Sequence, residues 1–201
     1  MDIFKELIKQ ISPFLKQMKF VKKRNTFYLK SDKNFGIINF QKSRESTNDL
    51  VRLTINFGIY SDILGEMDNV FDGSHPDVED CHWSARVGAF MPGMPDYWRE
   101  IGVSDDLTNV TLDVIASIQN LILPEINKRL SDEDLINNWI NRDFTGTTEI
   151  GRFKYLTTLI KKKGDLETLN QVVEDFMQQS VGKPNASIAM EHLKEIDYNK
   201  S

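Results

Sequence analysis

Apolar and polar positions follow two different periods in the first third of the chain. In residues 2–18 the apolar side chains recur at spacings of three and four, which is typical of one face of a helix. Residues 49–60 instead alternate strictly, with Val51 and Leu53 on one side and Arg52 and Thr54 on the other. Such alternation predicts a strand in a sheet that buries only one face. Pro13 interrupts the helical pattern, so we expect a kink or a break there.

The segments around this strand predict further strands. Residues 20–32 are predicted to form a strand pair that turns at 23–25, and residues 35–43 a single strand. The short polar connection 44–49 favours an antiparallel hairpin between 35–43 and 49–60. We also predict a strand over 81–88, and a loop over the proline- and glycine-containing segment 91–102.

The rest of the chain has helical patterns. Ser104 and Ser131 can each cap a helix, and further helices are predicted over 150–162, 166–179 and 186–196. The order helix, strands, helices predicts an α+β fold, with an antiparallel sheet of about four to five strands packed against helices. The small polar residues of 144–149 divide the chain into an α+β core domain (1–145) and a C-terminal helical extension (146–201) packed on the core.

Charge is distributed unevenly along the 201 residues, although the net charge is only −5. Residues 1–52 hold twelve Lys and Arg against five Asp and Glu, whereas residues 53–85 hold seven Asp and Glu and no Lys or Arg. Such asymmetry can mark a charged partner, and the acidic segment 61–80 is then the candidate surface for a protein. The alternative is that the two blocks lie close together in the fold and compensate each other.

Cysteine content and hydropathy predict the compartment. Cys81 is the only cysteine, so no disulfide can form within the chain, and a reducing compartment is favoured. The first residues contain no apolar stretch of signal-peptide length, and no run approaches the length of a membrane span. We therefore expect a soluble cytoplasmic protein that makes no membrane contact.

The residue patterns of phosphate-binding, metal and nucleophilic sites are absent from the sequence or incomplete in it. No phosphate-binding loop of the GxxxxGK[ST] or GxGxxG type is present. His75, Cys81 and His82 lie close together in an acidic stretch, but their spacing matches no standard zinc arrangement, so we expect no metal and no cofactor. On a strand, Cys81 and His82 would point to opposite faces, which argues against a Cys–His nucleophile.

A basic stretch near the N-terminus raises the question of nucleic acid. It interleaves cations with Phe20, Phe27 and Tyr28, a mixture also found on surfaces that bind single strands. Its cations are Lys16, Lys19, Lys22, Lys23, Arg24 and Lys30. The pI of about 5.3 argues against nucleic acid as the partner, and a solvated helix end followed by a turn is the simpler interpretation.

The phase of the predicted strands gathers polar side chains on one face of the sheet. In 81–88, Cys81 and Trp83 share the face predicted to enter the core, and His82 and Arg86 share the opposite face. If the polar faces of the three strands coincide, one surface carries His82, Arg86, Arg52, Asn56, Asn39 and Gln41. This surface is either a plain solvent-facing side of an antiparallel sheet or a binding face on which arginines contact carboxylates.

Four stretches in order give the chain a family resemblance. They are "FLKQMKFVKKRNTFYLK" (14–30), "GIINFQKS" (36–43), "LTINFGIY" (53–60) and "EDCHWSARVG" (79–88), followed by an aromatic pair before "REIG" (99–102). Over about residues 4–140 the chain resembles the bacterial family called domain of unknown function 4304. It departs from the family pattern at Lys19, where Gly is usual, and at Tyr97, where a second Trp is common.

The resemblance supplies no established activity. An association of relatives with bacterial toxin systems would imply an immunity or interaction role. Together with the acidic segment and the lack of a complete catalytic set, it favours a non-enzymatic binding module, which includes an immunity-type partner of another protein. The alternative is a domain that binds a small ligand or catalyses a reaction on the polar face around His82 and Arg86. The sequence does not specify the ligand, the partner or the oligomeric state.

Overall fold

The computed structural model describes residues 2–68, 75–94, 96–141, 143 and 145–199. Its six strands are β1 (Val21–Lys23), β2 (Thr26–Ser31), β3 (Asn34–Lys42), β4 (Leu50–Tyr60), β5 (Trp83–Arg86) and β6 (Arg99–Gly102). The α-helices are α1 (Ile3–Gln17), α2 (Asp62–Asp68), α3 (Leu107–Ser117), α4 (Leu123–Asn127), α5 (Asp132–Ile140), α6 (Glu149–Lys163), α7 (Leu166–Gln179) and α8 (Pro184–Glu195). Two short 3₁₀ segments, η1 (Val78–Asp80) and η2 (Val87–Phe90), flank β5, and a π-helical segment, η3 (Ile118–Ile122), joins α3 to α4.

The predicted α+β class is confirmed: all strands belong to one antiparallel sheet. Strands β1 to β5 lie side by side in chain order, and β6 pairs with the first half of β4, beyond β5. The predicted hairpin of β3 and β4 forms, with Phe35 opposite Tyr60 and Lys42 opposite Leu53. The short strand β6 lies in the segment predicted as a loop, because Arg99–Gly102 pairs with Leu53–Leu50 in the order of an antiparallel ladder.

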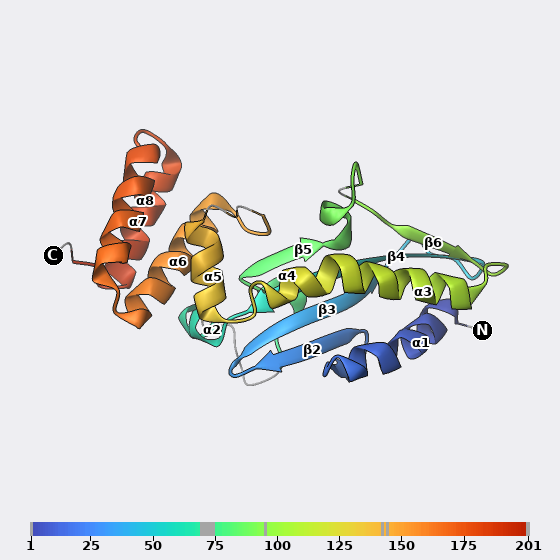
Figure 1. Ribbon diagram of the computed structural model, residues 1–201. Coiled ribbons are helices and arrows are strands. Elements are labelled where there is room, and N and C mark those ends of the chain that lie inside the picture. The colour runs from blue at the N-terminus through green and yellow to red at the C-terminus, as the bar shows by residue number, and fades with distance from the viewer. Residues whose placement is uncertain (1, 69–74, 95, 142, 144, 200–201) are drawn as a thin grey trace.

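Helices cover one face of the sheet, here called the inner face. Figure 1 shows α1 and the long α3–η3–α4 helix lying across it. The apolar residues predicted to share one side of β4, from Val51 to Ile59, are buried there. Gly36 lets α4 approach closely, since a Cβ at that position would lie 2.7 Å from Ile126 Cγ2. The helical pattern of residues 2–18 is also confirmed, and α1 continues unbroken through Pro13.

The remaining helices extend from one end of the sheet. In Figure 1, α5 to α8 lie beyond the ends of β2, β3 and β5, and the two termini lie at opposite ends of the molecule. Helix α6 contacts α2, α5, α7 and α8, so it joins the last helices to the core. Thr148 caps α6, and Gly164 ends it in a left-handed conformation with φ of 82°. No helix among the described residues is long and apolar enough to cross a membrane.

Strand β5 is shorter than the predicted strand over 81–88, and this changes the direction of its first residues. The 3₁₀ segment η1 precedes Cys81, and regular pairing with β4 begins only at Trp83. Trp83 is fully buried on the inner side, where its ring meets that of Phe57. The core position predicted for Cys81 is wrong, because its Cβ and Sγ lie against the opposite face, over Gly58.

Candidate functional site

Four polar side chains form a row across the face of the sheet opposite the helices, here called the outer face. The strand register places Thr26 opposite Asn39, Asn39 opposite Asn56, and Asn56 opposite Arg86. Directly opposed residues of antiparallel strands carry Cβ atoms about 5 Å apart, so short polar side chains can bond across. We call Thr26, Asn39, Asn56 and Arg86 the polar row.

Hydrogen bonds orient the members of the polar row. The Asn39 Nδ2 donates to Thr26 Oγ1 over 2.9 Å, and the Asn56 Nδ2 donates to Gln41 Oε1 over 2.7 Å. The Arg86 Nε donates to Asn56 Oδ1 over 3.4 Å. Gln41, Asn56 and Arg86 therefore form one connected chain of donors and acceptors, whose geometry is set before any partner arrives.

The guanidinium of Arg86 has two further neighbours from the loop after η2. It forms an ion pair with Asp96, and its carbon lies 5.2 Å from the centre of the Trp98 ring, within the range of a cation–π contact. The Arg86 side chain remains 32% exposed, and the Asp96 side chain is 73% exposed. Arg86 is thus held in place by a carboxylate that itself stands in solvent.

An open depression of about 550 Å³ lies over this chain of side chains. Its floor includes Gln41, Asn56 and Arg86, and η1 supplies one wall through Val78 and Glu79. Glu79 is exposed, so it brings a carboxylate to the same depression as the Arg86 guanidinium. The outer depression can contact a partner of mixed charge with both an acidic and a basic group.

Two of the predicted residues, His82 and Arg52, lie away from the polar row. His82 is only 3% exposed, its Nδ1 accepts a hydrogen bond from the Ser61 amide, and its ring contacts those of Tyr60 and Tyr155. Its Nε2 is directed at the carboxylate of Asp68, 3.6 Å away. The predicted exposure of His82 on the polar face is wrong, because the residue precedes the first paired residue of β5. The hydrogen bond between the Ser61 amide and the His82 ring links the start of α2 to the start of β5.

Arg52 lies on the outer face but apart from the polar row. It is four residues from Asn56 along β4, or about 13 Å at the rise of an extended strand. Its guanidinium pairs with Glu45 in the β3–β4 connection and, through Nε over 3.1 Å, with Glu100 of β6. Arg52 therefore holds β6 and the preceding loop to β4. Of the six predicted residues, the structure brings together Asn39, Gln41, Asn56 and Arg86.

The prediction of the polar face did not include four other residues around the depression, although one of them, Glu79, belongs to the acidic segment 61–80. Thr26 could have been found from its place opposite Asn39 once the first hairpin was predicted. Glu79, Asp96 and Trp98 come from η1 and a loop, where no periodic pattern sets the direction of a side chain. Nothing in the sequence indicated that both segments fold back toward Arg86.

Cys81 and His75 lie beside a small apolar cluster on the outer face. This cluster consists of Tyr28, Ile37, Tyr60 and Val78. The His75 ring lies 4.7 Å from that of Tyr28 and is exposed on its other side. The surrounding protein atoms, with Asp80 and Glu79, raise the pKa of the Cys81 thiol well above its ordinary value. The described residues contain no group of three or more side chains placed to hold a metal ion.

The acidic segment 61–80 does not form one continuous surface among its described residues. Asp62 pairs with Lys33 over 3.6 Å, while Asp77 and Asp80 bond to each other's backbone in a capping box around η1. Glu79 faces the outer depression, and Glu66 faces a different cleft. Residues 69–74 of the segment lie outside the described residues. The pair between Lys33 and Asp62 is one place where the basic and acidic blocks compensate each other.

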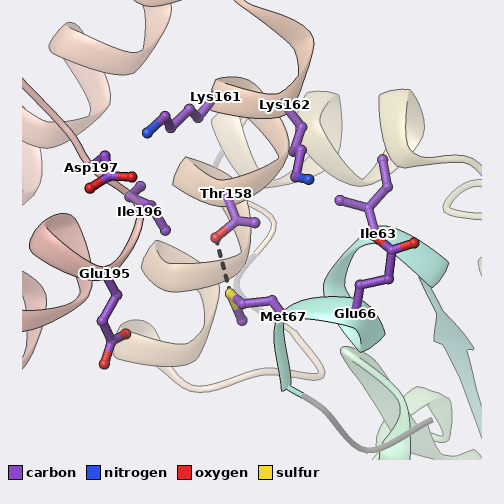
Figure 2. Close-up of a pocket in the computed structure, with 9 residues that line it drawn as sticks. All are labelled: Ile63, Glu66, Met67, Thr158, Lys161, Lys162, Glu195, Ile196 and Asp197. Carbon is purple, nitrogen blue, oxygen red and sulfur yellow. Dashed lines mark hydrogen bonds between the residues drawn. The ribbon is translucent and has the colours of Figure 1, made fainter. Parts of the chain in front are cut away.

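A second concave region of about 660 Å³ lies between α2, α6 and the end of α8 (Figure 2). Figure 2 shows Lys161 and Lys162 at its rim, with Glu66 on the α2 wall and Glu195 and Asp197 on the opposite wall. Its floor holds the Thr158 hydroxyl, which donates to the Met67 sulfur over 3.2 Å. The cleft contains both signs of charge from its own walls, so it shows no preference for an anion or a cation.

Comparison with known proteins places the chain in a family. A sequence model described as "Domain of unknown function (DUF4304)" matches residues 11–128, more than half of the chain. The chain belongs to the DUF4304 family. No curated protein and no solved structure matches it significantly.

The DUF4304 match contains the whole polar row and most of the structure around it. Thr26, Asn39, Gln41, Asn56, Glu79 and Arg86 all fall within residues 11–128. The cleft of Figure 2 instead takes Thr158, Lys161 and Glu195 from beyond the matched segment. The outer depression therefore lies within the DUF4304 domain itself.

Proposed function

We propose that this DUF4304 protein is a non-enzymatic binding module whose outer depression receives a partner protein. One observation carries the proposal: Gln41, Asn56 and Arg86 are bonded into a chain on an open face of the sheet. Side chains that are already oriented lose little conformational freedom on binding, so more of the contact energy is available for affinity. Rigid strands also position such groups more firmly than loops do.

Arg86 is the centre of the proposed contact. A guanidinium can bind a carboxylate through two parallel N–H···O bonds, which gives both affinity and orientation. A carboxylate of the partner takes the place of the exposed Asp96 on Arg86, while Trp98 keeps the guanidinium plane in position. Glu79 pairs with a cation of the same partner, so the acidic segment 61–80 contributes to the interface through this residue.

The narrower form of the proposal makes the partner a bacterial toxin that the protein masks in the cytoplasm. The single half-buried thiol of Cys81 is consistent with a reducing compartment. A basic toxin would be drawn to the acidic segment, since complementary charge accelerates encounter. This immunity-type role is a special case of protein binding, and the same surface carries it.

The alternative function is binding of a small ligand in the same depression. Its volume of about 550 Å³ lies within the range of known ligand pockets. The ligand would carry a carboxylate for Arg86 and an acceptor for the Asn56 amide. His82 takes no part, because its ring is buried under α2 and α6 rather than turned toward the depression.

Site-specific photo-crosslinking tests the protein-binding proposal. A photoreactive phenylalanine analogue is placed at exposed Gln41 in cells of the source organism, and at exposed Glu167 on α7 as the control. We expect a discrete crosslinked protein from Gln41 alone. With that protein purified, calorimetry on Arg86→Glu should show affinity at least about tenfold weaker, and Arg44→Glu, a charge reversal outside the depression, should match the wild type.

Two results would contradict the proposal. The first is that position 41 gives no crosslink beyond that of position 167. The second is a purified partner that binds Arg86→Glu and wild type equally. Stabilisation of the wild type by small carboxylic acids in thermal melting, absent in Arg86→Glu, would instead favour the ligand alternative.

A further inference from the structure

A second surface of distinct chemistry lies at the other edge of the sheet. A groove of about 350 Å³ separates the end of α1 from β1. It is lined by Lys16, Lys19 and Lys22 together with the apolar residues Phe20, Val21 and Phe27. We call it the basic groove. It shares no lining residue with the outer depression.

The cations in and beside the basic groove form no ion pairs with described acidic residues. Lys16, Lys19, Lys23 and Arg24 are all exposed, and none forms an ion pair with a described residue. Lys22 makes only a cation–π contact, with its Nζ 5.8 Å from the centre of the Phe27 ring. Five positive charges thus lie within nine residues of chain, and the described part of the protein leaves them uncompensated.

The strand beside these cations is an edge of the sheet. Strand β1 pairs with β2 on one side, and no described strand pairs with its other side. Lys19 and Arg24 adopt left-handed backbone conformations, with φ of 67° and 57°, and so confine β1 to three residues between two turns. Val21 is 64% exposed on this strand, an apolar side chain with no cover. Unpaired strand edges can accept a further strand from another chain.

We propose that the basic groove binds an acidic peptide segment in extended conformation. Its main chain lies along the free edge of β1, because a strand edge offers N–H and C=O groups at the spacing of a β-ladder. Alternate side chains of an added strand point the same way. Carboxylates on the face of Lys22 then reach the lysines of the groove, and apolar side chains on the opposite face cover Val21.

The same observations favour a peptide over a single-stranded nucleic acid. Base stacking needs exposed aromatic faces, but Phe20 is 3% exposed and Phe27 is 1% exposed. Tyr28, the third aromatic residue of the basic stretch, is 4% exposed and lies in the cluster of the outer face. The cations remain available for charge, but no described ring beside them is open to a base.

Fluorescence anisotropy with defined probes tests the inference on the full chain. The probe is a labelled octapeptide of alternating Glu and Val, measured at low salt, with an alternating Lys and Val octapeptide and a thymidine dodecamer for comparison. We expect the acidic peptide to bind and the basic one not to bind. The double variant Lys19→Glu/Lys22→Glu should weaken binding at least about tenfold, because it replaces attraction by repulsion.

Matched variants distinguish peptide binding in the basic groove from non-specific attraction to positive charge. The variant Lys161→Glu/Lys162→Glu makes the same charge change in the cleft of Figure 2 and should leave the affinity unchanged. Val21→Asp should weaken binding and remove the peptide-induced protection of the Val21–Lys23 amides from hydrogen exchange. Circular dichroism checks that each variant is folded.

Three outcomes overturn the inference. They are no binding of the acidic peptide by the folded wild type, equal binding by Lys19→Glu/Lys22→Glu, and tighter binding of the thymidine dodecamer than of the peptide. None of them bears on the outer depression, whose crosslinking test uses other residues.

Discussion

Arg129 lies face-on against Trp83, with its guanidinium carbon 4.2 Å from the centre of the ring system. Both side chains are buried, Arg129 with 1% exposure and Trp83 with none. Arg129 also pairs with Glu125 and Asp143, and the Trp83 Nε1 donates to the Thr145 carbonyl over 2.9 Å. This contact joins the end of α4, the start of β5 and the segment before α6.

Replacing Arg129 by Met should destabilise the protein by about 3 kcal/mol, because it leaves carboxylates without their buried cation. The control is Lys128→Met, since Lys128 pairs with the same Asp143 over 2.9 Å but from a half-exposed position. That variant should cost less than about 1 kcal/mol. Urea unfolding of both variants measures the difference. Equal losses would show that burial of the Arg129 charge does not matter.

Asp143 should make the stability of the fold depend on pH in the acidic range. Partial burial of the Asp143 carboxyl alone would raise its pKa. Hydrogen bonds from Lys128 and Thr145, together with the charge of Arg129, outweigh the effect of burial and hold the pKa well below 3.8. The unfolded state therefore takes up this proton first, so the contribution is complete above pH 4 and is lost as pH falls below it. Asp143→Asn should cost about 2 kcal/mol at pH 7, and its deficit should shrink toward pH 2. A constant deficit over that range would contradict the assignment.

His192 should make the stability of the fold depend on pH in a higher range than Asp143 does. Its ring is 1% exposed between α6 and α8, with Nε2 3.0 Å from Thr157 Oγ1. Burial and the charge of Lys154 lower its pKa from 6.5, and Glu195, 3.7 Å from Nδ1, opposes them only in part. Since the unfolded state binds the proton first, stability should fall as pH drops through 6.5.

Thermal melting between pH 8 and pH 5 measures this effect. His192→Gln keeps a hydrogen-bonding partner for Thr157 and should remove part of the decline, whereas the control His75→Gln, at an exposed position, should retain all of it. An identical pH profile for His192→Gln and the wild type would show that His192 is not the titrating group.

Gly58 should tolerate no side chain. It lies under the turn from η1 into β5, and a Cβ there would stand 2.6 Å from the Trp83 carbonyl oxygen and 2.8 Å from the Cys81 sulfur. Gly58→Ala should therefore cost about 1–3 kcal/mol by forcing this turn off the sheet. Gly102→Ala on β6 is the control, because its nearest atom would be 3.7 Å away. Equal melting temperatures for the two variants would contradict the predicted crowding.

The sequence predicted the parts of the fold that a periodic pattern specifies. Ten residues of strict alternation, 51–60, located β4 and its buried side, and spacings of three and four located α1. Strand β6 was missed because four residues pair with β4 only once the 87–98 loop has turned back. A short strand made by tertiary pairing carries little pattern of its own.

The sequence also predicted those residues of the candidate site that lie on strands with a clear alternating pattern. Asn39, Gln41 and Asn56 lie on strands whose phase was clear, and the register brings them together with Arg86. His82 was misplaced because alternation was extended one residue beyond the start of β5. Its direction depends on the bend after η1 and on the Ser61 amide, and neither has a local signal. The division into a core domain (1–145) and a C-terminal helical extension (146–201) packed on it stays a prediction.

The contact between Arg129 and Trp83 bears on where this protein can be cut. The DUF4304 match stops at residue 128, one residue before Arg129. A fragment ending there would lose the acceptor for the Trp83 indole, the Tyr155 ring against His82, and Leu130 over Gly36. We therefore expect that the limits of the DUF4304 match are not the limits of a stable fragment, and that a stable fragment needs the chain at least through α6.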